Sequence, residues 1–426
     1  MDSRHYNAAV RILISAGEAS GEMYGAQLME ALRSELRCVG DDSSGSPDSG
    51  HVGMGDLAPS AERSSAIPEP HFFGVGGTRM RDGGCDIVVD AQELSVVGIT
   101  EIVSHLPKIW RLFHHLIDEA DRRKPDLAIV IDSPAFNWRV AQQMKKRGVP
   151  VVYYVCPQFW AWRQGRARLL RKYVDKALVI FPFEEKFYRD RGVNAEFVGH
   201  PLADLARPAV TREEYAAQHG LVSSKPWITL MPGSRVKEVR MNLPEILRAA
   251  DLLESELEFI IPVAPTISKS VITELTQSRH TVVPIHLVSD SLPALAHSRA
   301  GIIASGTATV EAAMMELPFV MVYRVTPLTY LLGRWTVKVP HFAMVNLVAG
   351  EEVVMELVQH DFTAERVASE IREIIPDGPR REKVIAGLRR VKQLLAGEQD
   401  RNLHPAPRAA RSIVQLGAHR QLSENR

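Results

Sequence analysis

The expected architecture rests on one segment, Leu127-Ala128-Ile129-Val130-Ile131-Asp132-Ser133-Pro134-Ala135-Phe136-Asn137. Its apolar first half is typical of a buried strand, and its polar second half contains a proline that suits a turn. Residues 136–147 then show a helical pattern, and another apolar run follows at 151–155. A buried strand, a helix and a second buried strand in this order predict a parallel sheet covered by helices.

The same alternation runs through both halves of the chain. In the first half we expect strands at 11–15, 72–75, 127–131, 151–155, 177–181 and 195–198, with helices at 23–36, 106–121, 136–147, 166–173 and 183–191. In the second half we expect strands at 227–230, 258–263, 282–287, 301–304 and 319–323, with helices at 237–253, 307–315, 364–374 and 381–395. The pattern predicts an α/β fold with two Rossmann-like domains.

The domain limits follow from shifts in composition. We expect a first domain over 1–206 and a second over 207–400, with the boundary in the polar segment 206–226. Residues 39–70 are rich in Ser, Gly, Pro and Asp without an apolar period, which predicts a disordered insertion. The segment 401–426 ends in an expected helix at 408–416, which would pack back on the first domain.

Composition excludes several classes of protein. The chain of 426 residues has 51 Lys plus Arg and 51 Asp plus Glu, so the formal net charge is zero and no protein-wide basic field for nucleic acid exists. Cys38, Cys85 and Cys156 are too few for a disulfide framework or a zinc site. No apolar run approaches the roughly 20 residues that span a bilayer, and we expect no signal peptide. A reduced, cytoplasmic protein is predicted.

Two glycine-containing turns follow strands in the first half. They are Ala16-Gly17-Glu18-Ala19-Ser20-Gly21-Glu22 and Gly74-Val75-Gly76-Gly77. The first lacks the G-x-G-x-x-G fingerprint, which argues against NAD. Each turn alone is weak evidence of a ligand, because tight strand-to-helix turns favour glycine for structural reasons.

Two turns in the second half indicate a phosphate ligand more directly. Pro232-Gly233-Ser234-Arg235 and Ser305-Gly306-Thr307-Ala308 each lie between a strand and a helix. A helix N-terminus offers free N–H groups and a partial positive charge, and arginine adds a fork for phosphate oxygens. Glu311, one turn after Thr307, could accept hydrogen bonds from a ribose diol or be merely a solvated helix residue. We predict a site for a nucleoside diphosphate.

Asp132 is the candidate general base. It follows an apolar strand, and the carboxyl ends of parallel strands are where such sheets bind ligands. Glu18 competes for the same role, and Asp132 could instead be the N-cap of the following helix. No Asp-x-Asp motif occurs in the chain. We therefore expect no metal and no other cofactor, and a glycosyltransferase of the metal-independent two-domain plan.

A basic, aromatic segment completes the candidate sites. Trp160, Trp162, Arg163, Arg166 and Arg168 lie close together in the sequence. They could contact an anionic membrane surface or a phosphate on the acceptor. The alternatives are that the tryptophans pack in the core and the arginines are solvated, or that the segment binds RNA.

Together these motifs resemble the lipid-A-disaccharide synthase family, inverting glycosyltransferases of family 19. The resemblance covers the chain apart from residues 39–70 and the ends. Its carriers are the four glycine turns, Val97-Gly98-Ile99-Thr100-Glu101, Ile131-Asp132-Ser133-Pro134 with Phe136-Asn137, Trp160-Ala161-Trp162-Arg163, Gly199-His200-Pro201, and Asn346-Leu347 with Ala349-Gly350.

The resemblance implies a GT-B fold, with two sheets facing across a cleft, and a specific reaction. A 2,3-diacylglucosamine would move from its UDP donor to 2,3-diacylglucosamine 1-phosphate (lipid X), giving a β-1,6 disaccharide 1-phosphate and UDP. Asp132 would be the base on the acceptor hydroxyl. The nucleotide would be bound by Arg235, Gly233, Ser234, Ser305, Gly306, Thr307, Ala308, Glu311 and Asn346.

The resemblance also implies where the enzyme works. Gly17, Ser20 and the segment from Trp160 to Arg168 would form the acceptor and membrane face. The substrates carry acyl chains, so the protein would attach peripherally to the inner face of the inner membrane. The oligomeric state stays open, a homodimer included.

Two other functions are compatible with part of the pattern. An undecaprenyl-linked N-acetylglucosaminyl transferase or a UDP-N-acetylglucosamine 2-epimerase would share the nucleotide turns but lack the Ile131–Pro134 and Trp160–Arg163 motifs. A catalytically inactive binding module would bind UDP without turnover.

Overall fold

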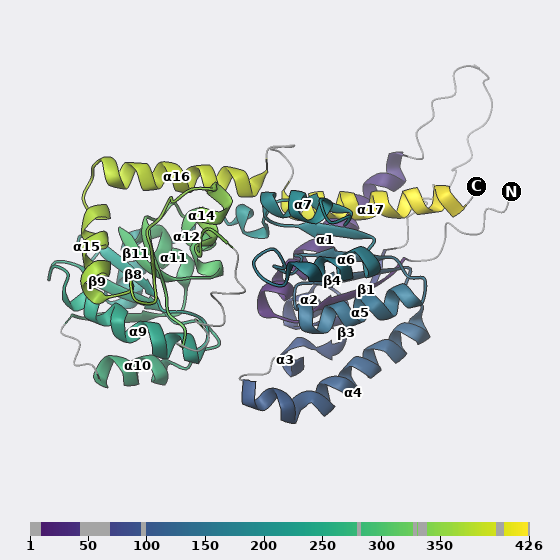
Figure 1. Cartoon of the computed structure of the whole chain (residues 1–426), viewed down its shortest axis with the longest axis horizontal. Helices are drawn as coiled ribbons and strands as arrows, with labels where there is room; N and C mark the ends of the chain where they lie inside the picture. Colours follow the sequence, from purple (N-terminus) through teal and green to yellow (C-terminus); the bar gives the residue numbers. More distant parts are fainter. Residues whose placement is uncertain are drawn as a thin grey trace, which may run out of the picture.

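Two lobes make up the structure, a computed structural model that describes residues 10–42, 69–94, 99–278, 283–326, 330, 339–397 and 404–424. Each lobe is built on one parallel sheet with helices packed on its faces (Figure 1). The α/β class predicted from the sequence is confirmed.

The first lobe holds a seven-stranded sheet in the order β3-β2-β1-β4-β5-β6-β7. Its strands are β1 (Arg11–Ala16), β2 (His71–Gly76), β3 (Cys85–Asp90), β4 (Leu127–Ile131), β5 (Val151–Tyr154), β6 (Lys176–Val179) and β7 (Ala195–Phe197). Its helices are α1 (Ala19–Asp42), α2 (Thr78–Asp82), α3 (Ala91–Leu94), α4 (Ile99–Arg123), α5 (Pro134–Lys146), η1 (Gln164–Arg166), α6 (Ala167–Tyr173) and α7 (Pro182–Arg189).

The second lobe holds a six-stranded sheet in the order β10-β9-β8-β11-β12-β13. Its strands are β8 (Trp227–Met231), β9 (Glu258–Pro262), β10 (Ile285–Val288), β11 (Ala300–Ala304), β12 (Phe319–Tyr323) and β13 (Glu356–Val358). Its helices are α8 (Arg212–His219), α9 (Val236–Asp251), α10 (Lys269–Ser278), α11 (Ser291–His297), α12 (Thr307–Met314), α14 (Met344–Ala349), α15 (Ala364–Ile374) and α16 (Pro379–Ala396).

Alternate residues of the central strands serve two different cores. On β4, Ile129 and Ile131 join the cluster that contains Leu28 of α1, whereas Ala128 and Val130 join the cluster of α4 and α5. All of these side chains are buried. A strand with both faces covered needs apolar residues at every position, which explains the unbroken apolar run that the sequence shows at 127–131.

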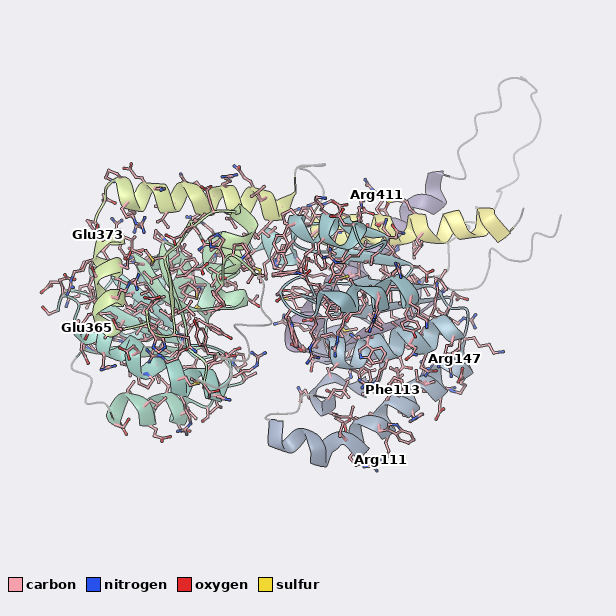
Figure 2. The ribbon with its side chains drawn as sticks, viewed as in Figure 1. Arg111, Phe113, Arg147, Glu365, Glu373 and Arg411 are labelled. Atoms are coloured by element: carbon pink, nitrogen blue, oxygen red, sulfur yellow. The ribbon has the colours of Figure 1, made fainter. Side chains whose placement is uncertain are left out.

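The chain connects the lobes twice. It first crosses through η2 (Pro201–Asp204), where the amide of His200 donates to the carbonyl of Leu395 on α16 at 2.8 Å. It returns with α17 (Pro405–Glu424), which packs along α1. Ala409, Ala410 and Ile413 of α17 are buried there. Figure 2 shows Arg411 of α17 and Arg111 of α4 on opposite sides of the first lobe.

Some elements differ from the sequence expectation. The strands β3 and β13 were not predicted, because acidic residues interrupt the apolar run of β3 and β13 has only 3 residues. The segment 206–226, expected to be a polar boundary, contains α8, whose capping box at Thr211 and left-handed Gly220 are ordinary helix signals. Residues 39–42 continue α1 rather than beginning the insertion. Residues 43–68 lie outside the described residues, so the predicted disorder stays a prediction.

Gly74 provides a test of the sheet geometry. Its φ is +145°, and a Cβ there would lie 2.1 Å from the carbonyl oxygen of Ile14 on the neighbouring strand. Gly74→Ala is therefore expected to lower the free energy of unfolding by about 3 kcal/mol or more. Urea unfolding followed by circular dichroism measures it. Gly148→Ala is the control, since Gly148 also has a positive φ of +75° but open space at Cβ. Equal effects of the two changes would contradict the predicted clash.

Candidate active site

Four turns of the chain lie where the two sheets reverse their strand order. In the first sheet the reversal falls between β1 and β4, and these strands lead to Glu18 and Asp132. In the second it falls between β8 and β11, which lead to Arg235 and Ser305. Open parallel sheets bind ligands outside the carboxyl ends of the strands at such points. The two topologies therefore select four of the turns that the sequence singled out, whereas the turn at residues 74–77 lies at the end of β2, outside the reversal.

The two sets of turns are close enough to interact electrostatically. The negative charge of Glu18 in the first lobe contributes to the raised pKa of Arg235 in the second, after the larger effect of Glu238. Burial raises the pKa of Tyr24 on α1, and the charges of Asp132 and Glu311 raise it further. Glu311 belongs to α12 of the second lobe, so Tyr24 lies near acidic groups of both lobes. The carboxyl edges of the two sheets thus face each other.

The turn that carries Asp132 has an unusual backbone. Asp132 and Ser133 have φ values of +48° and +44°, in the left-handed region that non-glycine residues rarely adopt. The buried amide of Asn137 holds this turn, because its Nδ2 donates to the carbonyls of Ile131 at 2.8 Å and Asp132 at 2.9 Å. The hydroxyl of Tyr153 donates to the Asp132 carbonyl at 2.8 Å.

The same amide connects the Asp132 turn to β1. Asn137 Nδ2 also donates to the carbonyl of Ser15 at 3.1 Å, and Ser15 Oγ donates to Asn137 Oδ1 at 2.7 Å. Gly17 passes so close that a Cβ on it would lie 2.6 Å from Ser133 Oγ. Gly17 is thus needed for the close approach of the two turns, which is a structural reason for glycine at this candidate position. Ser20 lies in the first turn of α1 and is partly buried.

The environment of Asp132 suits a general base. Burial, followed by the like charge of Glu18, raises the pKa of Asp132 to about 6, although the Ser133 amide opposes this by donating to the carboxylate. A carboxylate with this pKa is ionised at neutral pH yet more basic than an exposed aspartate. The alternative that Asp132 caps the next helix is wrong, because Ser133 is the N-cap of α5 and no side chain caps it.

In the second lobe, Arg235 stands at the start of α9. It is the N-cap residue, and its Nη1 donates to Glu238 Oε1 at 2.7 Å. Two side chains hold the preceding turn: Asn242 Nδ2 donates to the Pro232 carbonyl at 2.9 Å, and Thr266 Oγ1 donates to the Ser234 carbonyl at 2.6 Å. The guanidinium and the start of α9 therefore lie side by side, as an anion site requires.

The second turn of this lobe presents the start of α12. Gly306 is its N-cap, with φ at +147°, and Gly306 and Thr307 are exposed. Ser305 Oγ donates to the Phe342 carbonyl at 2.9 Å, which links the turn to the segment before α14. Burial raises the pKa of Glu311 to about 7. Glu311 is thus partly buried and lies near Tyr24, so the alternative that it is merely a solvated helix residue is wrong.

Asn346 has a structural role in this lobe. Its Nδ2 donates to the Val354 carbonyl at 2.9 Å and to Glu356 Oε1 at 2.8 Å, and its Oδ1 accepts from the amides of Val353 and Val354. The side chain is buried and fully hydrogen-bonded. Asn346 thus shapes the segment that Ser305 contacts, and it presents no free polar atom to a nucleotide in this structure.

The basic, aromatic segment divides into a buried and an exposed part. Trp160 is buried and its Nε1 donates to Glu184 Oε1 at 2.8 Å, so its expected place on the acceptor and membrane face is wrong. Burial raises the pKa of Glu184 to about 7 even though it accepts this bond and two backbone amides. The exposed residues are Trp162, over which the Arg163 guanidinium stacks at 4.4 Å, Arg166 and Arg168.

Several residues of the site were not assigned by sequence reasoning. Asn137 was quoted in a motif without a role, and Tyr24, Glu238 and Asn242 were missed. Glu238 had a local signal, because an acidic residue in the first turn of a helix favours contact with the N-terminal amides. Tyr24 had none, since its place near both lobes depends on tertiary structure.

The comparison with known proteins identifies the family. The sequence model described as lipid-A-disaccharide synthetase matches residues 48–408. The chain belongs to the lipid-A-disaccharide synthase family. It is 47% identical over 412 residues to the lipid-A-disaccharide synthase of Koribacter versatilis, covering 96% of this chain and 98% of that protein. It is 42% identical over 424 residues to that of Acidobacterium capsulatum, covering 97% and 98%. The family and the glycosyltransferase class expected from the sequence are confirmed.

Solved structures agree on the fold. A putative UDP-N-acetylglucosamine 2-epimerase from Listeria monocytogenes superposes with a TM-score of 0.57 at 11% identity, covering 89% of this chain and 91% of that one. MurG of Acinetobacter baumannii gives a TM-score of 0.53 at 14% identity, covering 96% and 100%. These likenesses show the GT-B fold alone. The choice between the epimerase, the undecaprenyl-linked transferase and the lipid A enzyme rests on the relatives in the family.

Within the described parts of the chain, no helix is both long enough and apolar enough to cross a bilayer.

Asn137 provides a test of the clamp on the Asp132 turn. Asn137→Ala is expected to lower the free energy of unfolding by roughly 2 kcal/mol or more. The buried Ser15 hydroxyl loses its acceptor, and three backbone carbonyls lose the amide that donates to them. Thermal unfolding measures the loss. Asn194→Ala is the control, since Asn194 Nδ2 makes a single exposed bond to the Asp175 carbonyl at 2.9 Å. Similar losses in the two variants would argue against the clamp.

Proposed function

We propose that this chain transfers 2,3-diacylglucosamine from UDP-2,3-diacylglucosamine to 2,3-diacylglucosamine 1-phosphate (lipid X). The products would be the β-1,6-linked disaccharide 1-phosphate and UDP. Synthesis of the lipid A disaccharide follows from the family, and the family match over residues 48–408 carries this conclusion. The donor, acceptor and linkage are the finer part of the proposal.

The facing turns supply a role for each lobe. Asp132 takes the proton from the acceptor hydroxyl, and the oxygen attacks the anomeric carbon as the bond to UDP breaks. Because this is a single displacement, the configuration at the anomeric carbon is inverted. Two observations support the role of Asp132. Its pKa is raised, and it lies at the edge of the first sheet that faces Arg235. Gly17, whose close packing keeps the Glu18 and Asp132 turns together, contributes to the shape of this face.

The second lobe would bind the nucleotide. Arg235, together with the amides of Gly233 and Ser234 and the start of α12 at Gly306, Thr307 and Ala308, would bind the diphosphate. Glu311 would accept hydrogen bonds from the ribose. In this proposal the charge of the leaving diphosphate is met by the guanidinium and the helix termini, so no divalent ion takes part.

The acyl chains place the enzyme at a membrane surface in this proposal. Each chain of a dozen carbons favours the bilayer by on the order of 10 kcal/mol. Leu106 and Trp110 on α4 are 52% and 65% exposed and lie beside Pro107 and Arg111 on one exposed, mainly apolar stretch of this helix. Since α4 starts beyond the carboxyl end of β3, its first half lies at the same sheet edge as Asp132. This helix and the exposed Trp162 would contact the inner face of the inner membrane.

A thin-layer assay with the diacyl UDP-sugar and lipid X tests the function. We expect disaccharide 1-phosphate and UDP to form, in EDTA as in buffer. Asp132→Asn should lower turnover by roughly 100-fold or more and leave UDP affinity nearly unchanged, because only the base is lost.

The matched control for this assay is Asp126→Asn at the opposite end of β4, where Asp126 pairs with Arg11. This variant should keep turnover within about 2-fold. No disaccharide from the unmodified chain would refute the proposed reaction, and UDP binding without turnover would indicate the inactive binding module. Full turnover by Asp132→Asn would remove Asp132 from the mechanism.

The pH dependence distinguishes Asp132 from Glu18 as the base. A base must be deprotonated, so kcat/KM should rise with pH around a pKa of about 6 and fall below it. Glu18→Gln removes a like charge that raises this pKa, so the acidic limb should move to lower pH while activity persists. Rates of both forms between pH 4.5 and 8 measure the shift. Loss of turnover in Glu18→Gln at every pH would make Glu18 the base instead.

A further inference from the structure

The carboxylate of Glu238 occupies the place where the start of α9 would hold an anion. Its Oε1 accepts from Arg235 Nη1 at 2.7 Å, and its Oε2 accepts from the amide of Ser234 at 3.3 Å. Both donors belong to the turn that is proposed to bind the diphosphate. Glu238 lies in the first turn of α9, three residues after the N-cap Arg235. The chain thus places one of its own anions on its anion-binding donors.

The turn is built closely around this carboxylate. Gly233 has φ at +127°, and a Cβ on it would lie 2.7 Å from Glu238 Cβ and 2.8 Å from Oε2. The bonds from Asn242 to the Pro232 carbonyl and from Thr266 to the Ser234 carbonyl also hold the turn. The backbone amide of Ser234 is therefore fixed toward the Glu238 side chain.

A bound diphosphate would compete with Glu238 for these donors. Arg235 has five N–H groups and could serve two anions, but the Ser234 amide has one hydrogen. Two anions in contact with the same amide also repel each other. The Arg235 and Glu238 side chains are 76% and 31% exposed, so the ion pair can open into solvent without burying an unpaired charge.

We propose that Glu238 is a displaceable internal anion that fills the diphosphate turn of the empty enzyme and competes with the nucleotide for Arg235 and the Ser234 amide. The carboxylate keeps Arg235 oriented before the donor binds, and its return helps UDP to leave after transfer. The proposal rests on the function proposed above, because the competing ligand is the diphosphate of that reaction.

The test is the affinity of the full-length chain for UDP, measured by isothermal titration calorimetry. Glu238→Gln keeps the size of the side chain and removes its charge. We expect it to lower the Kd for UDP about 5-fold, the upper range for loss of a competing exposed ion pair. The Kd for uridine, which lacks phosphate, should not change. The inhibition constant of UDP as product should fall by a similar factor.

Two further variants make the result specific. Glu238→Ser removes the carboxylate and leaves a smaller polar side chain, and it should tighten UDP binding in the same way. Glu274→Gln is the matched control. Glu274 pairs with Arg240 of α9 at 3.4 Å, so this change removes an exposed charge beside the same helix without contact with the turn. It should leave the Kd for UDP unchanged.

The outcomes separate this inference from the proposed function. Unchanged or weaker UDP binding in both Glu238 variants, with UDP binding intact in the unmodified chain, would overturn the competition and leave the proposed function standing. An equal gain in UDP affinity in Glu274→Gln would also overturn the competition, because the gain would then come from the loss of any nearby negative charge. Absence of UDP binding in the unmodified chain would refute both.

Discussion

The side chain of Asn137 ties together the two strands on which the first half of the site depends. Its amide reaches Ser15 at the end of β1 and the carbonyls of Ile131 and Asp132 at the end of β4. Two consecutive left-handed residues cost on the order of 1–3 kcal/mol each, so they persist only where the surroundings hold them. This buried amide and the hydroxyl of Tyr153 supply that restraint. The position of the candidate base is therefore set by a polar contact within the core.

The second lobe uses the same topology for a different task. Both sheets place two turns at a reversal of strand order, yet the first lobe presents carboxylates and the second presents amides and a guanidinium. A partly buried Asp132 with a pKa near 6 and an exposed Arg235 are complementary for transfer from a diphosphate. The lobes differ in chemistry because the residues after the strands differ, whereas the strands themselves are similarly apolar.

Much of the architecture was accessible from the sequence because it depends on local patterns. Strands buried on both faces require unbroken apolar runs, and β4, β8 and β12 were therefore predicted close to their observed limits. The edge strands β3 and β13 were not predicted, since charged residues break the apolar pattern of β3 and β13 is very short. The turns of the second lobe were predicted because glycine and arginine between a strand and a helix place amides and a guanidinium together, which favours an anion.

The contacts that distinguish the site residues were not accessible in this way. Trp160 and Trp162 are two residues apart and have the same composition around them, but only the first meets Glu184 in the core. Asn346 was assigned to the nucleotide by resemblance alone, and its complete hydrogen bonding depends on residues 353–356, which lie outside its local motif. The pairing of Glu238 with Arg235 similarly depends on the path of the turn at Gly233. Such contacts depend on the tertiary structure, and local patterns in a single sequence do not reveal them.

The helix α17 has a consequence for how the protein is made. It is synthesised after the whole second lobe, yet it packs against α1 of the first lobe. Until residues 405–424 emerge, the apolar surface that Ala409, Ala410 and Ile413 will cover stays open to water. The first lobe thus completes its packing only after the whole second lobe has been synthesised. Apolar surface exposed in this way during synthesis favours aggregation.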